Sequence, residues 1–227
     1  SGDDRADRAL LPRILATAAE GAERPASKVR AHYDTIEALM AGESLADIAE
    51  RFAPRPGDAL LTTRLLDGSA VILGKPAVRQ ALQAAIDSLE DRGCGLIALL
   101  CTGEFEGLAT RAAWLLEPDR VVPPVVAALA QSRQVGVVVP LAEQAATEAH
   151  KWQALARPPI YEVATPYAQG LDALAHAAQA LQARGAKMLV LDCMGYTEGH
   201  RARAREASGL PVLLSNAVMA RLLGELA

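Results

Sequence analysis

The chain has 227 residues, of which 51% are hydrophobic, 22% are charged and only 4% are aromatic, and its formal net charge is −4. This composition predicts one large domain or two small lobes with a core of Leu, Ala and Val. The negative charge argues against a nucleic-acid surface, and no apolar run approaches the length that spans a bilayer. Three cysteines without framework spacing predict free thiols in the cytoplasm.

Hydrophobic periodicity and turn residues give the elements of the first half. We expect helix 3–20, strand 28–36, helix 44–52, strands 59–65 and 69–73 around the Asp67-Gly68 turn, helix 77–91, strand 96–100, helix 108–116, strand 120–122 and helix 124–131. Compared with the second half, this order lacks an opening strand. The pattern therefore predicts a strand before residue 1.

The second half alternates strands and helices regularly. We expect strand 135–139, helix 143–155, strand 160–164, helix 170–184, strand 188–192, helix 198–207, strand 212–214 and helix 216–226. Such alternation predicts an α/β fold with parallel sheets flanked by helices. We place an N-terminal lobe at residues 1–133, with the helix of 215–227 packing back on it, and a C-terminal lobe at 134–214.

One stretch occurs twice in the sequence. Arg92–Gly103 reads RGCGLIALLCTG and Arg184–Gly195 reads RGAKMLVLDCMG, with Arg-Gly, an aliphatic run, a cysteine and a glycine at equal offsets. The same offset matches residues 120–124 with 212–216. The repeat predicts two pseudo-symmetric lobes with Cys101 and Cys193 at equivalent strand ends, where ligands bind in such folds.

The sequence lacks the common cofactor motifs. Gly74-Lys75 is followed by Pro76 instead of Ser or Thr, so it is not a phosphate-binding loop. The Gly93-x-Gly95 pair precedes a strand instead of following one, and the four histidines are dispersed. We therefore predict that the protein uses no metal and no cofactor.

The two repeated thiols are the candidate catalytic groups. Cys101 and Cys193 each follow a strand, and we expect each to face the start of a helix that lowers its pKa toward neutrality. Gly103 and Gly195 allow a close backbone approach. Cys94 has no counterpart in the second repeat and is interpreted as a small buried hydrophobic residue.

Two thiols on opposite sides of a cleft can invert a carbon centre. One thiolate removes a proton beside a carboxylate or carbonyl, and the other thiol returns a proton to the opposite face. Nearby groups are candidates for binding the substrate and the developing oxyanion: Thr102, Gly103, Gly195, Tyr196, Thr197, Ser215 and Asn216. Helix capping is an equal interpretation for Thr197 and Ser215, and packing is one for Tyr196.

Several of these stretches resemble the AroM family. They are LLCTGEF at 99–105, VLDCMGYT at 190–197, PVLLSNAVMARLLGEL at 211–226, VGVVVP at 135–140 and the Lys151-Trp152-Gln153 trio. The resemblance runs from about Leu10 to the C-terminus. AroM proteins generally open with a strand that ends in a T-I-G-Q-like loop, and this chain lacks that strand.

The AroM family is similar to the aspartate/glutamate/hydantoin racemase superfamily. The resemblance implies two pseudo-symmetric α/β lobes, two catalytic cysteines and no pyridoxal phosphate, with Cys101 at the first cysteine position and Cys193 at the second. Amino-acid racemases tend to have Cys-Asn-Thr and Gly-Cys-Thr at these sites. This chain has Cys101-Thr102-Gly103 and Asp192-Cys193-Met194 instead.

The sequence therefore predicts a cytoplasmic, cofactor-independent isomerase of the racemase or epimerase type that acts on a small carboxylate or hydantoin-type molecule. Within the same superfamily, cis–trans isomerisation of an unsaturated diacid and decarboxylation of a malonate are alternatives. An alternative of another class is a small-molecule binding or regulatory protein without turnover. We expect no nucleic-acid or membrane partner, and a homo-oligomer is left open.

Overall fold

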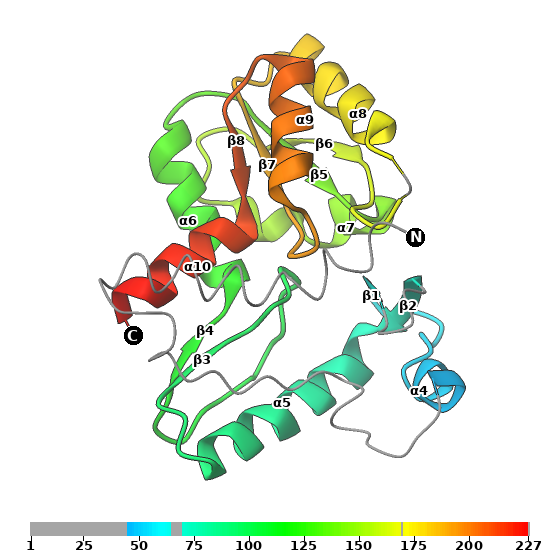
Figure 1. The fold of residues 1–227 in the computed structure, drawn as a ribbon, viewed down its shortest axis with the longest axis vertical. Helices are drawn as coiled ribbons and strands as arrows, with labels where there is room; N and C mark the ends of the chain where they lie inside the picture. Colours follow the sequence, from blue (N-terminus) through cyan, green and yellow to red (C-terminus); the bar gives the residue numbers. More distant parts are fainter. Residues whose placement is uncertain (1–44, 65–69, 169, 227) are drawn as a thin grey trace. The chain divides into compact units, whose positions relative to one another are not determined.

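The computed structural model describes residues 45–64, 70–168 and 170–226 (Figure 1). These residues form two compact units. The larger comprises 100–104 and 117–226, and the smaller comprises the described residues of 45–99 together with 105–116. The predicted helix 3–20 and strand 28–36 lie outside the described residues. The predicted lobe boundary near residue 133 stays a prediction.

A four-stranded parallel sheet organises the larger unit. Its strands lie in the order β6, β5, β7, β8, with bounds Ile160–Val163, Val135–Val139, Met188–Leu191 and Val212–Leu214. Every residue of β5 and β7 is buried, whereas the outer strands β6 and β8 are only partly so. Central strands of a parallel sheet are covered on both faces, which explains their continuous apolar runs. The predicted α/β class with a parallel sheet flanked by helices is confirmed.

Helices cover both sides of this sheet. They are α6 (Pro118–Ala130), α7 (Ala142–Thr147), the 3₁₀ turn η2 (Ala149–Trp152), α8 (Asp172–Ala183), α9 (Glu198–Ser208) and α10 (Ser215–Leu226). In Figure 1, α8 and α9 lie together on one side and α6 lies on the other. Leu181 of α8 packs with Leu189 and Leu191 of β7 in one buried cluster. At Gly136 a Cβ would lie 3.1 Å from Leu181, so glycine lets α8 approach β5 closely.

The smaller unit contains the predicted hairpin and the long helix that follows it. β1 (Leu60–Arg64) pairs antiparallel with β2 (Ala70–Gly74), and α5 (Lys75–Asp91) begins directly after β2. A short helix, α4 (Leu45–Arg51), precedes them. β3 (Leu96–Ala98) pairs in parallel with β4 (Trp114–Leu116). None of the described helices is both long and apolar enough to cross a membrane.

The sequence-based prediction is wrong between residues 108 and 122. The expected helix 108–116 is a loop that ends in strand β4, and the expected strand 120–122 lies inside helix α6. Glu117 is extended at the N-cap and Pro118 takes the first helical position, which is a helix start and not a stop. The repeat match of 120–124 with 212–216 therefore fails. The helix expected over 143–155 is also interrupted, because α7 ends at Thr147 before η2.

The loop between β3 and β4 is fixed to α5 by side chains. The Glu90 carboxylate accepts the backbone N–H groups of Arg111, Ala112 and Ala113 at 2.8–2.9 Å. Arg79 donates to the carbonyls of Glu106 and Gly107, both at 2.7 Å. These contacts order a segment that has no helix or sheet of its own.

We expect Glu90→Gln to loosen this loop. Backbone hydrogen bonds lower the pKa of Glu90 to about 2. The largest contribution comes from the N–H of Ala113, followed by those of Arg111 and Ala112. A carboxyl whose pKa is lowered by folding stabilises the fold above its unfolded pKa, and this stabilisation is lost as the pH falls through the folded value. Urea midpoints of the wild type should therefore approach those of Glu90→Gln between about pH 4.5 and pH 2.

Glu106→Gln is the matched control, because Glu106 is an exposed carboxylate of the same loop. It should leave both the urea midpoint and cleavage by trypsin at Arg111 unchanged. Equal trypsin resistance of Glu90→Gln and the wild type would show that the carboxylate does not hold the loop.

Candidate functional site

The candidate thiols lie on two segments that are bonded to each other in the larger unit. Cys193 follows the carboxyl end of β7, where the Asp192 N–H donates to the carbonyl of Val138 at 3.0 Å. The Thr102 hydroxyl donates to the carbonyl of Asp192 at 3.2 Å. Cys101 and Cys193, each next to one end of this bond, are therefore on adjoining segments. Burial is the main cause that raises the pKa of Cys101, and a negative charge on Cys193 raises it further, as expected for neighbouring thiols.

The two sulfurs have different hydrogen-bond partners. The Sγ of Cys193 accepts the Gly195 N–H at 3.5 Å and lies 3.9 Å from the Tyr167 hydroxyl. The Sγ of Cys101 has the N–H of Gly103 as its donor. Both cysteines are free and only partly exposed. Each thiol is thus held by the glycine two residues after it, and Cys193 has an additional phenol.

Burial raises the pKa of both thiols, to about 12 for Cys101 and about 11 for Cys193. The expectation that a helix start lowers both pKa values is wrong. No helix follows Cys101 before β4, and α9 begins only at Glu198. Desolvation of a thiolate therefore outweighs the nearby N–H donors. Burial thus favours the protonated form of both thiols.

A buried ionic cluster lies beside the thiols. The Lys151 ammonium contacts the carboxylates of Asp192 at 2.5 Å and Glu148 at 2.8 Å, and it donates to the Thr102 carbonyl at 3.1 Å. The side chains are 4% exposed for Lys151, 2% for Asp192 and 6% for Glu148. When all three are ionised, one positive charge faces two negative charges. We call Lys151, Glu148 and Asp192 the ionic cluster.

The ionic cluster keeps its lysine charged. Burial alone would lower the pKa of Lys151, but the charges of Asp192 and Glu148 outweigh burial and raise that pKa well above its ordinary value. Burial also raises the pKa of Tyr161 to about 12. The buried Tyr161 hydroxyl has no hydrogen-bond partner among the described residues, although the charges of the cluster act on it.

Ser215 and Asn216 fix the backbone around Cys193. The Ser215 hydroxyl lies 3.1 Å from Asp192 Oδ1 and 3.3 Å from the Leu191 carbonyl, and can donate to either. The Asn216 amide donates to the carbonyls of Met194 at 3.0 Å and Tyr196 at 2.6 Å. Both side chains are buried. In this structure they position the Cys193 segment through its neighbours.

Tyr196 and Thr197 have structural partners as well. Tyr196 is fully buried, its hydroxyl donates to the Ala164 carbonyl, and its ring packs edge-on against His200. Thr197 precedes α9, with its N–H 3.0 Å and its hydroxyl 2.8 Å from Nδ1 of His200. These contacts support the packing interpretation of Tyr196 and the capping interpretation of Thr197.

A family model described as AroM protein matches residues 32–227 of this chain. The chain belongs to the AroM family. No functionally curated protein matches this AroM chain. Its similar solved structures include arylmalonate decarboxylase, with 17% identity and a TM-score of 0.47 over 67% of this chain and 78% of that chain. They also include an aspartate racemase homologue from Pyrococcus horikoshii OT3, with 10% identity and a TM-score of 0.48 over 95% and 94% of the two chains.

Sequence reasoning missed two residues that contact the thiol segments of this AroM protein. Lys151 belongs to a trio that resembles the family, and its spacing of three from Glu148 was visible, but the sequence did not indicate a role for it. Tyr167 lies in the loop after β6, where no periodicity marks a contact with Cys193. Both residues come to the thiol segments only through the fold.

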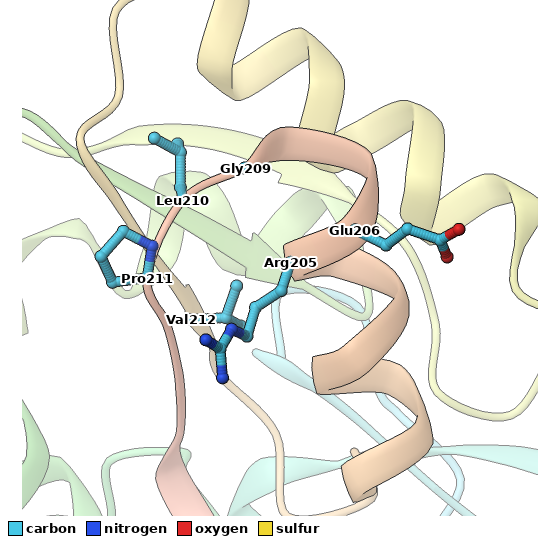
Figure 2. Close-up of a pocket in the computed structure, with 6 residues that line it drawn as sticks. All are labelled: Arg205, Glu206, Gly209, Leu210, Pro211 and Val212. Carbon is cyan, nitrogen blue, oxygen red and sulfur yellow. The ribbon is translucent and has the colours of Figure 1, made fainter.

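A surface hollow of this AroM protein lies apart from the two thiols. Its volume is about 580 Å³, and its lining residues are Arg205, Glu206, Gly209, Leu210, Pro211 and Val212. Figure 2 shows the side chains of Arg205 and Glu206 pointing in different directions from α9. The hollow lies at the start of β8. Because β8 runs parallel to β7, the hollow is near the amino ends of these strands, whereas Cys193 follows the carboxyl end of β7.

Among the described residues, no group of three or more His, Cys, Asp or Glu side chains could hold a metal ion.

Proposed function

We propose that this AroM protein is a cofactor-independent isomerase of the racemase or epimerase type that uses Cys101 and Cys193 as paired acid and base. The observation that carries the proposal is the hydrogen bond from Thr102 to the Asp192 carbonyl. This bond brings two thiol-bearing segments together from distant parts of the chain. A lone buried cysteine is ordinarily a small hydrophobic residue, whereas two neighbouring thiols can act as the acid and the base of a proton transfer.

In the proposed reaction, one thiolate removes the proton from the carbon beside a carbonyl or carboxylate. The C–H bond breaks, an S–H bond forms, and the electron pair moves toward the substrate oxygen. The other thiol then donates its proton to the opposite face of the same carbon and becomes the thiolate. The pair is left with its proton transferred from one sulfur to the other, ready for the reverse turnover.

The substrate in this proposal is a small carboxylate or a hydantoin-type molecule, bound from the cytoplasm without a nucleic-acid or membrane partner. The donors around the thiols already have protein partners, as with Thr102, Ser215 and Asn216. We therefore assign these three residues to positioning the two cysteine segments.

A second candidate is a small-molecule binding or regulatory protein of the same family. The raised pKa of both thiols favours it, because a thiol with a pKa of about 11 or 12 is almost entirely protonated at neutral pH. A third candidate is cis–trans isomerisation or decarboxylation by one of the thiols. Cis–trans isomerisation needs a thiolate that adds to the double bond, whereas decarboxylation needs a protonated thiol that gives its proton to the carbon that loses CO₂.

Solvent deuterium exchange tests the isomerase proposal. The protein is incubated in D₂O with 2-substituted carboxylic acids and 5-substituted hydantoins, and deuterium at the substrate carbon is followed by NMR. Because proton transfer by a placed group contributes about 10²–10⁴-fold, we expect Cys101→Ser and Cys193→Ser each to slow exchange by at least ~10²-fold.

Cys94→Ser is the matched control, since Cys94 lies before β3 in the smaller unit, whereas Cys101 and Cys193 belong to the larger unit. Its exchange rate should equal that of the wild type. Calorimetric binding of a compound that shows no exchange would favour the binding protein. Decarboxylation of a malonate without exchange would favour the third candidate.

A further inference from the structure

Tyr167 lies against the turn that carries Cys193. It comes from the loop after β6. Because β6 and β7 both run parallel to β5, the carboxyl ends of β6 and β7 lie at the same end of the sheet. Its backbone N–H donates to the Thr165 hydroxyl at 3.3 Å, and its own hydroxyl lies 3.9 Å from Cys193 Sγ. The Tyr167 side chain is partly buried. The phenol is therefore held beside one of the two thiols.

Gly195 makes room for this tyrosine. A Cβ at Gly195 would lie 2.8 Å from Cε1 and 2.9 Å from the hydroxyl oxygen of Tyr167, closer than real Cβ atoms approach such neighbours. The same glycine donates its N–H to Cys193 Sγ at 3.5 Å. Any larger residue would displace the ring. Glycine here thus serves the contact between Tyr167 and Cys193.

The two thiols are consequently unequal. Among the described residues, Cys193 has two potential donors, the Gly195 N–H and the Tyr167 O–H, whereas Cys101 has the Gly103 N–H. A hydrogen bond to the charged form favours ionisation, so the second donor favours a thiolate at Cys193. A phenol O–H that faces a neutral thiol becomes a charge-assisted donor once the sulfur loses its proton.

The other groups that act on Cys193 oppose ionisation or add no donor. The carboxylates of Asp192 and Glu148 repel a thiolate there. Ionised Cys193 and Cys101 repel each other, so the pair carries at most one charge at ordinary pH. The Tyr196 hydroxyl donates to the Ala164 carbonyl instead. Among the described residues, the phenol is thus the donor that Cys193 has in addition to a glycine N–H, whereas the positive charge of Lys151 favours a thiolate at Cys101.

We propose that Tyr167 is a positioning residue that selects Cys193 as the thiol that ionises first, so that Cys193 starts as the base and Cys101 as the acid. The assignment of base and acid rests on the proposed function, but the order of ionisation does not. A thiolate at Cys193 removes the proton only from the enantiomer whose C–H bond points toward Cys193. The other enantiomer reacts only after a proton has moved from Cys101 to Cys193, which leaves the thiolate at Cys101.

Alkylation by iodoacetamide as a function of pH tests the order of ionisation. The background Cys94→Ser/Cys101→Ser leaves Cys193 as the single thiol, and Cys94→Ser/Cys193→Ser leaves Cys101. In the first, Tyr167→Phe should raise the midpoint of the pH profile by about half to one unit, which slows alkylation below the midpoint about three- to tenfold. In the second, Tyr167→Phe should change neither midpoint nor rate.

The plateau rate at high pH separates access from ionisation, because a more open site raises the plateau without moving the midpoint. An unchanged midpoint at Cys193, or equal shifts at both thiols, would overturn the role of Tyr167. Gly195→Ala in the Cys193 background gives an independent check, since displacing the ring should raise the midpoint in the same direction. Absence of deuterium exchange in the wild type would sink the proposed function while leaving this thiol measurement intact.

Discussion

Lys151→Met is expected to destabilise the protein by about 3–5 kcal/mol at pH 7, because removing one partner of a buried ion pair leaves uncompensated charge in the interior. Methionine keeps most of the apolar stem of the lysine but removes its charge. The carboxylates of Asp192 and Glu148, 2% and 6% exposed, would then repel each other without a cation between them. Urea unfolding followed by circular dichroism measures the change.

Comparison with a surface ion pair identifies the cause of this loss. Arg203→Met is the matched control: Arg203 forms a surface pair with Glu206 at 3.1 Å, and such pairs contribute about 0–1 kcal/mol. A loss for Lys151→Met as small as that of the control would contradict the account.

Most of the larger unit follows from its sequence pattern. β5, β7 and α8 were predicted within two residues of their observed ends, because short apolar runs and an Ala/Leu helix have clear periods. Residues 108–122 were not. Pro123 and Pro124 lie inside α6 and remove two helical N–H donors, so local patterns argue for a break there. Burial of Val122, Val126 and neighbouring residues of the same face offsets this cost.

The candidate site was predictable only where the chain repeats itself. The repeat identified Cys101 and Cys193, and the structure places their segments together. The sign of the thiol pKa shifts was not predictable, since it depends on burial and on carboxylates that come from other elements. Lys151 illustrates the same limit: its charge is typical of a surface residue, and only the fold surrounds it with two carboxylates.

The raised thiol pKa values predict a steep pH dependence of exchange. If proton abstraction needs a thiolate, the rate follows the fraction of ionised Cys193, whose pKa is about 11. Below that value the thiolate fraction rises about tenfold for each pH unit. We therefore expect kcat/KM for deuterium exchange to increase roughly a thousandfold from pH 7 to pH 10, with no plateau in this range.

Hydroxide-catalysed exchange also rises with pH. The exchange rate measured with Cys193→Ser is therefore subtracted from that of the wild type at each pH. Tyr167→Phe should move the whole curve toward higher pH, because it removes a donor to the same sulfur. A plateau already at pH 8 would contradict the prediction, since it would require a thiolate that forms near neutrality. A positive charge that binds with the substrate would then have to offset burial and the neighbouring carboxylates, which raise the pKa of Cys193. Without substrate, the rate of alkylation would still rise up to about pH 11.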